Sequence, residues 1–86
     1  MLYLCGDKII GPMGLQYAQM DPDAIVVLIK DGVYLDTEAV KDKKIYAIDE
    51  DVKRRGMEDR LKDTADIIGY DKLVDLVFEN KVANFV

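Results

Sequence analysis

The chain has 86 residues, a formal net charge of −5 and one cysteine, Cys5, and it contains no histidine, tryptophan or serine. These absences exclude a serine nucleophile, a histidine base, a zinc site of cysteines and histidines, and a paired-cysteine redox motif within one chain. The acidic charge argues against binding of nucleic-acid backbones as the main activity, because such binding depends on clustered lysine and arginine. Any chemistry must use Cys5, carboxylates, lysine or tyrosine, or belong to a partner.

The length predicts one small domain spanning residues 1–86. A chain of this size buries only about 60–65% of the surface that its unfolded form exposes, so its core is thin. No stretch approaches the roughly 20 apolar residues of a membrane span, and the amino terminus shows no signal peptide. We therefore expect a protein of the cytoplasm that makes no membrane contact.

The first third of the chain predicts two strands and one helix. Residues 2–5 form the first predicted strand. Pro12 suits the first turn of a helix, so residues 13–20 are predicted to be helical. The helix should end at the turn of residues 21–23, since the residue before a proline is pushed out of the helical region. The apolar run of residues 24–29 is the second predicted strand.

The segment after the second strand has two interpretations. Asp31-Gly32 between two apolar runs is a strong hairpin signal, and would make residues 33–36 an antiparallel return strand. The interval 30–44 also holds the dozen or so residues that a parallel crossover needs. We favour the crossover, with residues 33–41 as a short helix and with Gly32 supplying backbone freedom at a tight turn.

The middle of the chain carries a consistent set of local signals. Residues 44–48 form the third predicted strand. Asp49 is a natural N-cap for a helix that reaches Arg55 and ends at Gly56. Acidic residues in the first turn of this helix and basic residues in its last turn both complement the helix dipole.

The last third of the chain predicts a further helical turn, a strand, a helix and a closing strand. These elements are expected at residues 57–63, 65–68, 70–80 and 82–86. The helix is amphipathic, with the apolar side chains of Leu73, Leu76 and Val77 along one face, which Asn80 could extend. The direction of the closing strand stays open.

This alternation of buried strands and helices predicts an α/β fold. We expect three layers, α/β/α, around a mainly parallel sheet of four to five short strands with flanking helices. A parallel sheet needs cover on both faces, and a chain of this length supplies only about four short helices. Another subunit should therefore cover part of the apolar surface, in a homo- or hetero-oligomer.

Cys5 is the candidate for sulfur chemistry. It lies at the carboxyl end of the first predicted strand, the edge where open α/β sheets place ligands. A nearby helix start could lower the pKa of its thiol and favour the thiolate that would accept sulfur. Free cysteine is commonly a small buried hydrophobe instead. We favour this structural role and keep a persulfide on Cys5 as the alternative.

The other candidates are surface groups. The acidic residues 49–51 could bind a metal, but helix capping explains them better, so no metal or cofactor is predicted. Arg54 and Arg55 could face a partner, although a basic last turn is favourable without one. Tyr34 and Tyr46 suit a subunit interface, where tyrosine is enriched, and suit core packing equally well.

Four segments in order resemble the DsrH/TusB family of sulfur-relay proteins. The first segment is Met-Leu at the start of the chain, and the second is Asp-Gly-Val-Tyr at residues 31–34. The third, at residues 45–56, consists of a strand, an acidic turn and Arg-Arg-Gly. The fourth, at residues 70–77, is Tyr-Asp followed by a helix with the sequence Val-Asp-Leu-Val. The resemblance covers essentially the whole chain. No single tetrapeptide is diagnostic, and the specificity lies in the order and spacing.

The resemblance implies a small subunit of a sulfurtransferase complex, in which a persulfide passes between cysteines. The relay serves 2-thiolation of a tRNA wobble uridine in the TusBCD version and sulfur oxidation in the DsrEFH version. The implied partners are DsrE/TusD-like and DsrF/TusC-like subunits. Some DsrH-type members carry a cysteine in the first helix, but residues 13–20 contain none. The chain is therefore expected to be accessory to a persulfide-carrying partner, to be noncatalytic by itself, and to make no direct contact with nucleic acid.

Two other functions remain open. The chain could be an autonomous sulfur carrier through Cys5. It could also be a homo-oligomeric binding module that keeps the fold without relay activity.

Overall fold

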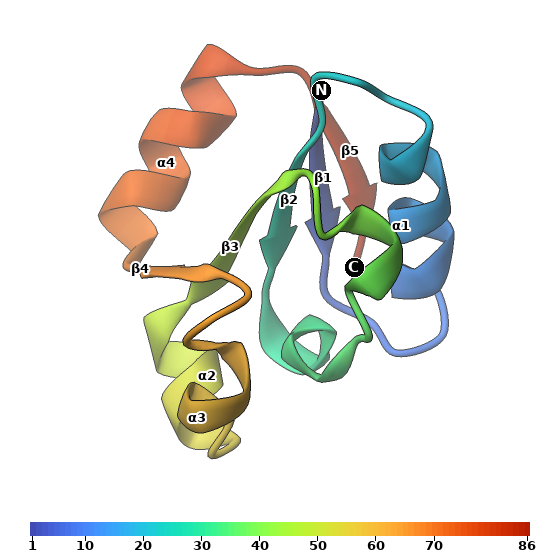
Figure 1. The fold of residues 1–86 in the computed structure, drawn as a ribbon. Helices are drawn as coiled ribbons and strands as arrows, with labels where there is room; N and C mark the ends of the chain where they lie inside the picture. Colours follow the sequence, from blue (N-terminus) through green and yellow to red (C-terminus); the bar gives the residue numbers. More distant parts are fainter.

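A computed structural model describes residues 1–86 and contains a sheet of five parallel strands (Figure 1). The strands are β1 Leu2–Cys5, β2 Ile25–Leu28, β3 Lys44–Ile48, β4 Asp66–Ile68 and β5 Val82–Phe85. Their order across the sheet is β4-β3-β2-β1-β5. The predicted α/β fold with a parallel sheet is confirmed.

The last strand lies at the opposite edge of the sheet from the strand that precedes it. β5 pairs with β1 in parallel, with Leu2 opposite Val82 and Cys5 opposite Phe85. The helix between β4 and β5, α4 Tyr70–Glu79, therefore belongs to a connection that spans the whole sheet. This connection places β5 beside the first strand of the chain.

Two short 3₁₀ turns form the crossover between β2 and β3. They are η1 Lys30–Tyr34 and η2 Glu38–Val40. The hairpin interpretation is wrong, because β2 and β3 are parallel. The predicted helix over residues 33–41 is also wrong: Leu35 is extended, and the carboxylate of Asp36 accepts a hydrogen bond from the backbone N–H of Glu38 at 3.0 Å. This Asx-type contact starts a new turn instead of continuing a helix.

Three further helices lie close to their predicted positions. They are α1 Gly11–Gln19, α2 Asp49–Arg54 and α3 Glu58–Leu61. The N-cap of α2 is Ile48, and Asp49 is the first helical residue, so the predicted capping role of Asp49 is wrong. Gly56 adopts a φ of 64° after the helix, as a glycine terminator does.

The two faces of the sheet are covered unequally. The larger cluster of buried side chains lies under α1, the two 3₁₀ turns, α2 and α3, and includes Leu15, Val33, Val52 and Leu61. The other face is covered by α4, which contributes buried Leu76 and half-buried Leu73 (Figure 1). Val77, predicted to share this inner face, is exposed instead. None of the helices is long and apolar enough to span a membrane.

Candidate functional site

Cys5 ends β1 and its side chain is completely buried. The thiol donates a weak hydrogen bond to the carbonyl oxygen of Tyr3, with the sulfur 3.9 Å from that oxygen. Burial raises the pKa of the Cys5 thiol to about 12. The lowering of this pKa by a helix start, which the persulfide alternative would need, is not found; desolvation by burial sets the direction of the shift. A thiol that is protonated at neutral pH and closed off from solvent has the properties of a structural cysteine.

The 3₁₀ turn η1 closes the carboxyl end of β1. A Cβ atom on residue 32 would lie 1.9 Å from the carbonyl oxygen of Cys5, so only glycine fits there. The positive φ in this turn, 49°, belongs to Lys30. Gly32 is therefore required for close approach of two backbone segments, and the predicted role in backbone freedom is wrong.

A polar network ties three elements together at this edge of the sheet. The guanidinium Nε of Arg55 donates to Asp31 at 3.0 Å, and its Nη1 lies 3.6 Å from the carboxylate of Asp51. Asp51 is buried, and its other oxygen accepts a hydrogen bond from the hydroxyl of Tyr70 at 3.5 Å. Partial burial, and then the charge of Asp51, raise the pKa of Tyr70. The network connects α2 to η1 and to the start of α4.

This network was not predicted from the sequence as a unit. The four-residue spacing of Asp51 and Arg55 is a usable local signal, since such residues share a helix face. The contact between Arg55 and Asp31 joins residues 24 positions apart, which no local pattern indicates. The network holds α2, η1 and the start of α4 in position, and its charged and polar groups bond to one another.

The remaining charges of α2 are paired within the helix. Lys53 lies 3.3 Å from Asp49, and Arg54 lies 2.9 Å from Glu50, both at four-residue spacing. All four side chains are largely exposed. Two of the acidic residues considered as metal ligands, Asp49 and Glu50, thus form ion pairs with basic residues of the last turn of the same helix.

The two tyrosines considered for an interface are half-buried in the chain itself. Tyr34 packs against the larger core cluster, and the amine of Lys8 lies 4.8 Å from its ring centre. Tyr46 packs on the opposite face, with the amine of Lys44 5.1 Å from its ring centre. Each ring therefore has intramolecular contacts that account for its position.

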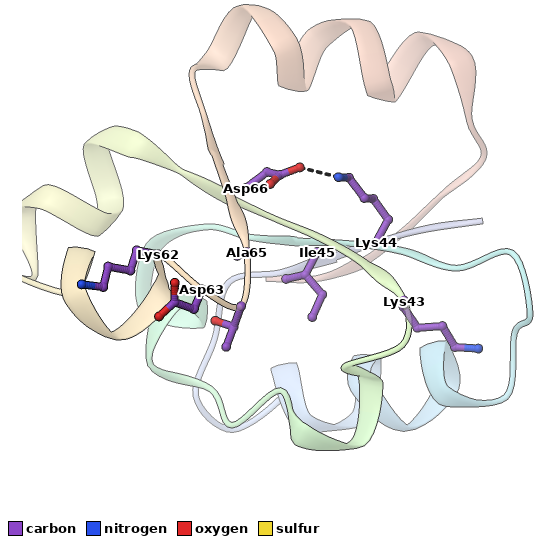
Figure 2. Close-up of a pocket in the computed structure, with 8 residues that line it drawn as sticks. Lys43, Lys44, Ile45, Lys62, Asp63, Ala65 and Asp66 are labelled. Atoms are coloured by element: carbon purple, nitrogen blue, oxygen red, sulfur yellow. Dashed lines mark hydrogen bonds and ion pairs between the residues drawn. The ribbon is translucent and has the colours of Figure 1, made fainter.

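A polar hollow lies at the amino ends of β3 and β4. Its volume is about 180 Å³, and its lining includes Lys43, Lys44, Lys62 and Asp66. Figure 2 shows Lys44 paired with Asp66, while the amines of Lys43 and Lys62 point away in opposite directions. A ligand site needs polar groups that converge on one point. This hollow lacks that arrangement.

The outer side of α4 is an exposed apolar surface. Phe78 is 86% exposed, and Tyr70, Val74 and Val77 are about half exposed. We call these four residues the α4 surface. Their spacing places them on one side of the helix, beside an acidic row at four-residue spacing formed by Asp71, Asp75 and Glu79. Contiguous exposed apolar side chains of this kind mark interaction sites.

Comparisons with known proteins identify a family for this sequence. The family model for DsrH like protein matches residues 14–83. The chain is also similar to Protein TusB from Buchnera aphidicola subsp. Baizongia pistaciae (strain Bp), with 29% identity over 59 residues. That alignment covers 69% of this chain and 62% of the relative's length.

Proposed function

Because this chain belongs to the DsrH family, we propose that it is an accessory subunit of a sulfur-relay complex whose persulfide is carried by a DsrE/TusD-like partner. The observation that carries this assignment is the burial of Cys5, the one thiol of the chain. A nucleophilic sulfur must be ionised and accessible, and this thiol is neither at neutral pH. The sulfur chemistry therefore belongs to a neighbour.

The α4 surface supports a role in assembly. Phe78 and Val74 present apolar area that the chain itself leaves uncovered, and the acidic row borders it. A complementary partner would offer an apolar groove with lysine or arginine along one side. We assign this surface to the DsrE/TusD-like or DsrF/TusC-like subunit.

The proposed relay delivers sulfur for 2-thiolation of a tRNA wobble uridine or a related acceptor in the cytoplasm. In this proposal the other subunits contact the RNA. The net charge of −5 supports this, and so does the pairing of Lys53 and Arg54 with acidic residues of the same helix. Arg55 is likewise engaged by Asp31. The contribution of this chain is to hold the relay subunits in position.

Coexpression with DsrE/TusD-like and DsrF/TusC-like subunits from the same source tests the assembly. We expect the wild-type chain to copurify with them, and Phe78→Asp to raise the dissociation constant at least about 30-fold with an unchanged melting temperature. Met20→Asp, an apolar-to-acid change at another strongly exposed position, directly after α1, is the matched control and should retain binding. Absence of any complex with the wild-type chain would overturn the relay role. Normal binding by Phe78→Asp would overturn only the assignment of the surface.

A further inference from the structure

The two faces of the central strands are buried to different degrees. On the side of α1, the side chains of Cys5, Leu28 and Ala47 are completely buried. On the side of α4, Leu4 of β1 and Ile29, which directly follows β2, are only half-buried. A parallel sheet is normally covered on both faces by helices. The chain therefore leaves part of the α4 face of its sheet without cover.

The path of α4 determines which part is left open. The helix begins at Tyr70, beyond the carboxyl end of β4, and Leu76 in its second half belongs to the cluster that buries Leu2 at the amino end of β1. α4 thus crosses this face of the sheet obliquely (Figure 1). The carboxyl halves of β2, β1 and β5, which are neighbours in the sheet, lie outside this path. These three strands span about 10 Å, which is about the width of one helix.

Side chains from three neighbouring strands meet in this uncovered region. A Cβ atom on Gly6, directly after β1, would lie 3.0 Å from Cγ1 of Ile29 and 3.0 Å from Cγ1 of Val86. The side chains that follow β2 and β5 therefore close over the end of β1. The residues that present their side chains here form the open strip: Leu4, Ile29, Val82, Asn84 and Val86. None of them is charged, and Val86 is 51% exposed.

The other side of the same face is charged. Lys44 of β3 and Asp66 of β4 form an ion pair that lies on the α4 side of the sheet (Figure 2). Charged residues are depleted in the cores of protein interfaces, and charges on an edge strand keep other chains from pairing with it. The contrast indicates that a partner covers the open strip and leaves the β4 side of this face in solvent.

The open strip adjoins one flank of the α4 surface. Leu73 and Leu76 face the sheet, so a right-handed connection from β4 to β5 turns the flank with Val74 and Val77 toward β1 and β5. One apolar area thus lies along a helix, and the other lies on the strands beside it. A helix fits both areas, because helices cover the faces of parallel sheets and pack beside other helices at axial distances of about 8–10 Å.

We propose that one amphipathic helix of the relay subunit packs on the open strip, beside α4, and completes the missing layer on this face of the sheet. The inference rests on the proposed function and names the part of the partner that binds. Apolar side chains of that helix cover Leu4, Ile29 and Val86. A polar side chain of the helix bonds to the amide of Asn84, which both donates and accepts.

Photo-cross-linking in the coexpressed complex tests the proposal. Asn84→p-benzoylphenylalanine places a photoreactive side chain at an exposed position of the open strip. After irradiation and peptide mass analysis, we expect cross-links to residues three or four positions apart on one helix of a relay subunit. Gln16→p-benzoylphenylalanine, exposed on α1, is the control and should give none. Cross-links from Asn84 to a loop, a strand or a second copy of this chain would overturn the proposal, and so would their absence in an intact complex.

A charge placed on the open strip supplies a second measurement. Val86→Asp should raise the dissociation constant of the complex at least about tenfold with an unchanged melting temperature. Met13→Asp is the matched control and should retain binding, because Met13 is also 51% exposed but lies on α1, on the other face of the sheet. Normal binding by Val86→Asp, with weakened binding by Phe78→Asp, would overturn the assignment of the open strip and leave the relay role intact. Absence of any complex with the wild-type chain would overturn both.

Discussion

Gly14 packs directly against the thiol of Cys5, and a Cβ atom at position 14 would lie 2.9 Å from the sulfur. The ring of Phe85 closes the same space at 2.8 Å from that Cβ position. Protein interiors are close-packed, so adding one sulfur atom to this thiol requires the core to open. The packing around Gly14 and Cys5 therefore supports the proposal that another subunit carries the sulfur.

The first prediction concerns the accessibility of the thiol. We expect Cys5 to react with a chromogenic disulfide reagent at least about a thousandfold more slowly in native buffer than in denaturant, because reaction needs transient opening of the core. Absorbance measured over time in both conditions checks this. Rapid labelling of the native protein would contradict the description of Cys5 as a structural residue.

The second prediction concerns alkaline pH. Burial raises the pKa of the folded thiol from 9.0 to about 12, so the unfolded chain releases its proton first as pH rises. The contribution of Cys5 to stability is complete below pH 9 and is lost between pH 9 and 12, by about 1.4 kcal/mol per pH unit. Urea denaturation from pH 7 to 11 should show a steeper loss for wild type than for Cys5→Ala. Parallel curves would show that the thiol ionises equally in both states.

The third prediction concerns the contact between η1 and β1. Gly32→Ala would place a methyl group 1.9 Å from the carbonyl oxygen of Cys5, and backbone atoms must move to admit it. We expect the free energy of unfolding to fall by about 3 kcal/mol or more. Gly69→Ala is the matched control, because no atom lies within 4 Å of its added methyl group. Equal stabilities of the two variants in chemical denaturation would disprove the close approach.

The fourth prediction separates a buried charge from an exposed pair. Arg55→Met leaves the carboxylate of Asp51 buried beside Tyr70 without its cation, and should lower the free energy of unfolding by about 2 kcal/mol. Arg54→Met removes an equivalent charge from an exposed pair with Glu50 and should cost about 0.5 kcal/mol or less. Urea denaturation at neutral pH measures both. A larger effect at Arg54 would contradict the assigned network.

The parts of the fold that depend on local chemistry were predicted well. The strand at residues 44–48 and the helix stop at Gly56 match the structure, because a β-branched run and a glycine terminator act within a few residues. The N-cap of α2 was misplaced by one position. The N-cap is Ile48, which makes no side-chain capping hydrogen bond, and the acids Asp49, Glu50 and Asp51 occupy the first turn instead, where they complement the helix dipole.

The parts that depend on distant contacts were not predictable. The parallel direction of β5, the approach of Gly32 to Cys5 and the contact of Arg55 with Asp31 each join positions far apart in the sequence. The exposure of Phe78 also depends on where α4 lies on the sheet. Among the candidate residues, the sequence alone left the state of Cys5 open, since burial is set by packing around it.

Sulfur transfer through the reconstituted complex tests the central claim most directly. The three subunits would be loaded from a persulfide donor, and the sulfur on each chain measured by intact mass at successive times. We predict that wild type and Cys5→Ala support the same transfer rate, with the persulfide on the DsrE/TusD-like partner and none on Cys5. A persulfide on Cys5, together with loss of transfer in Cys5→Ala and normal assembly of that variant, would contradict the claim.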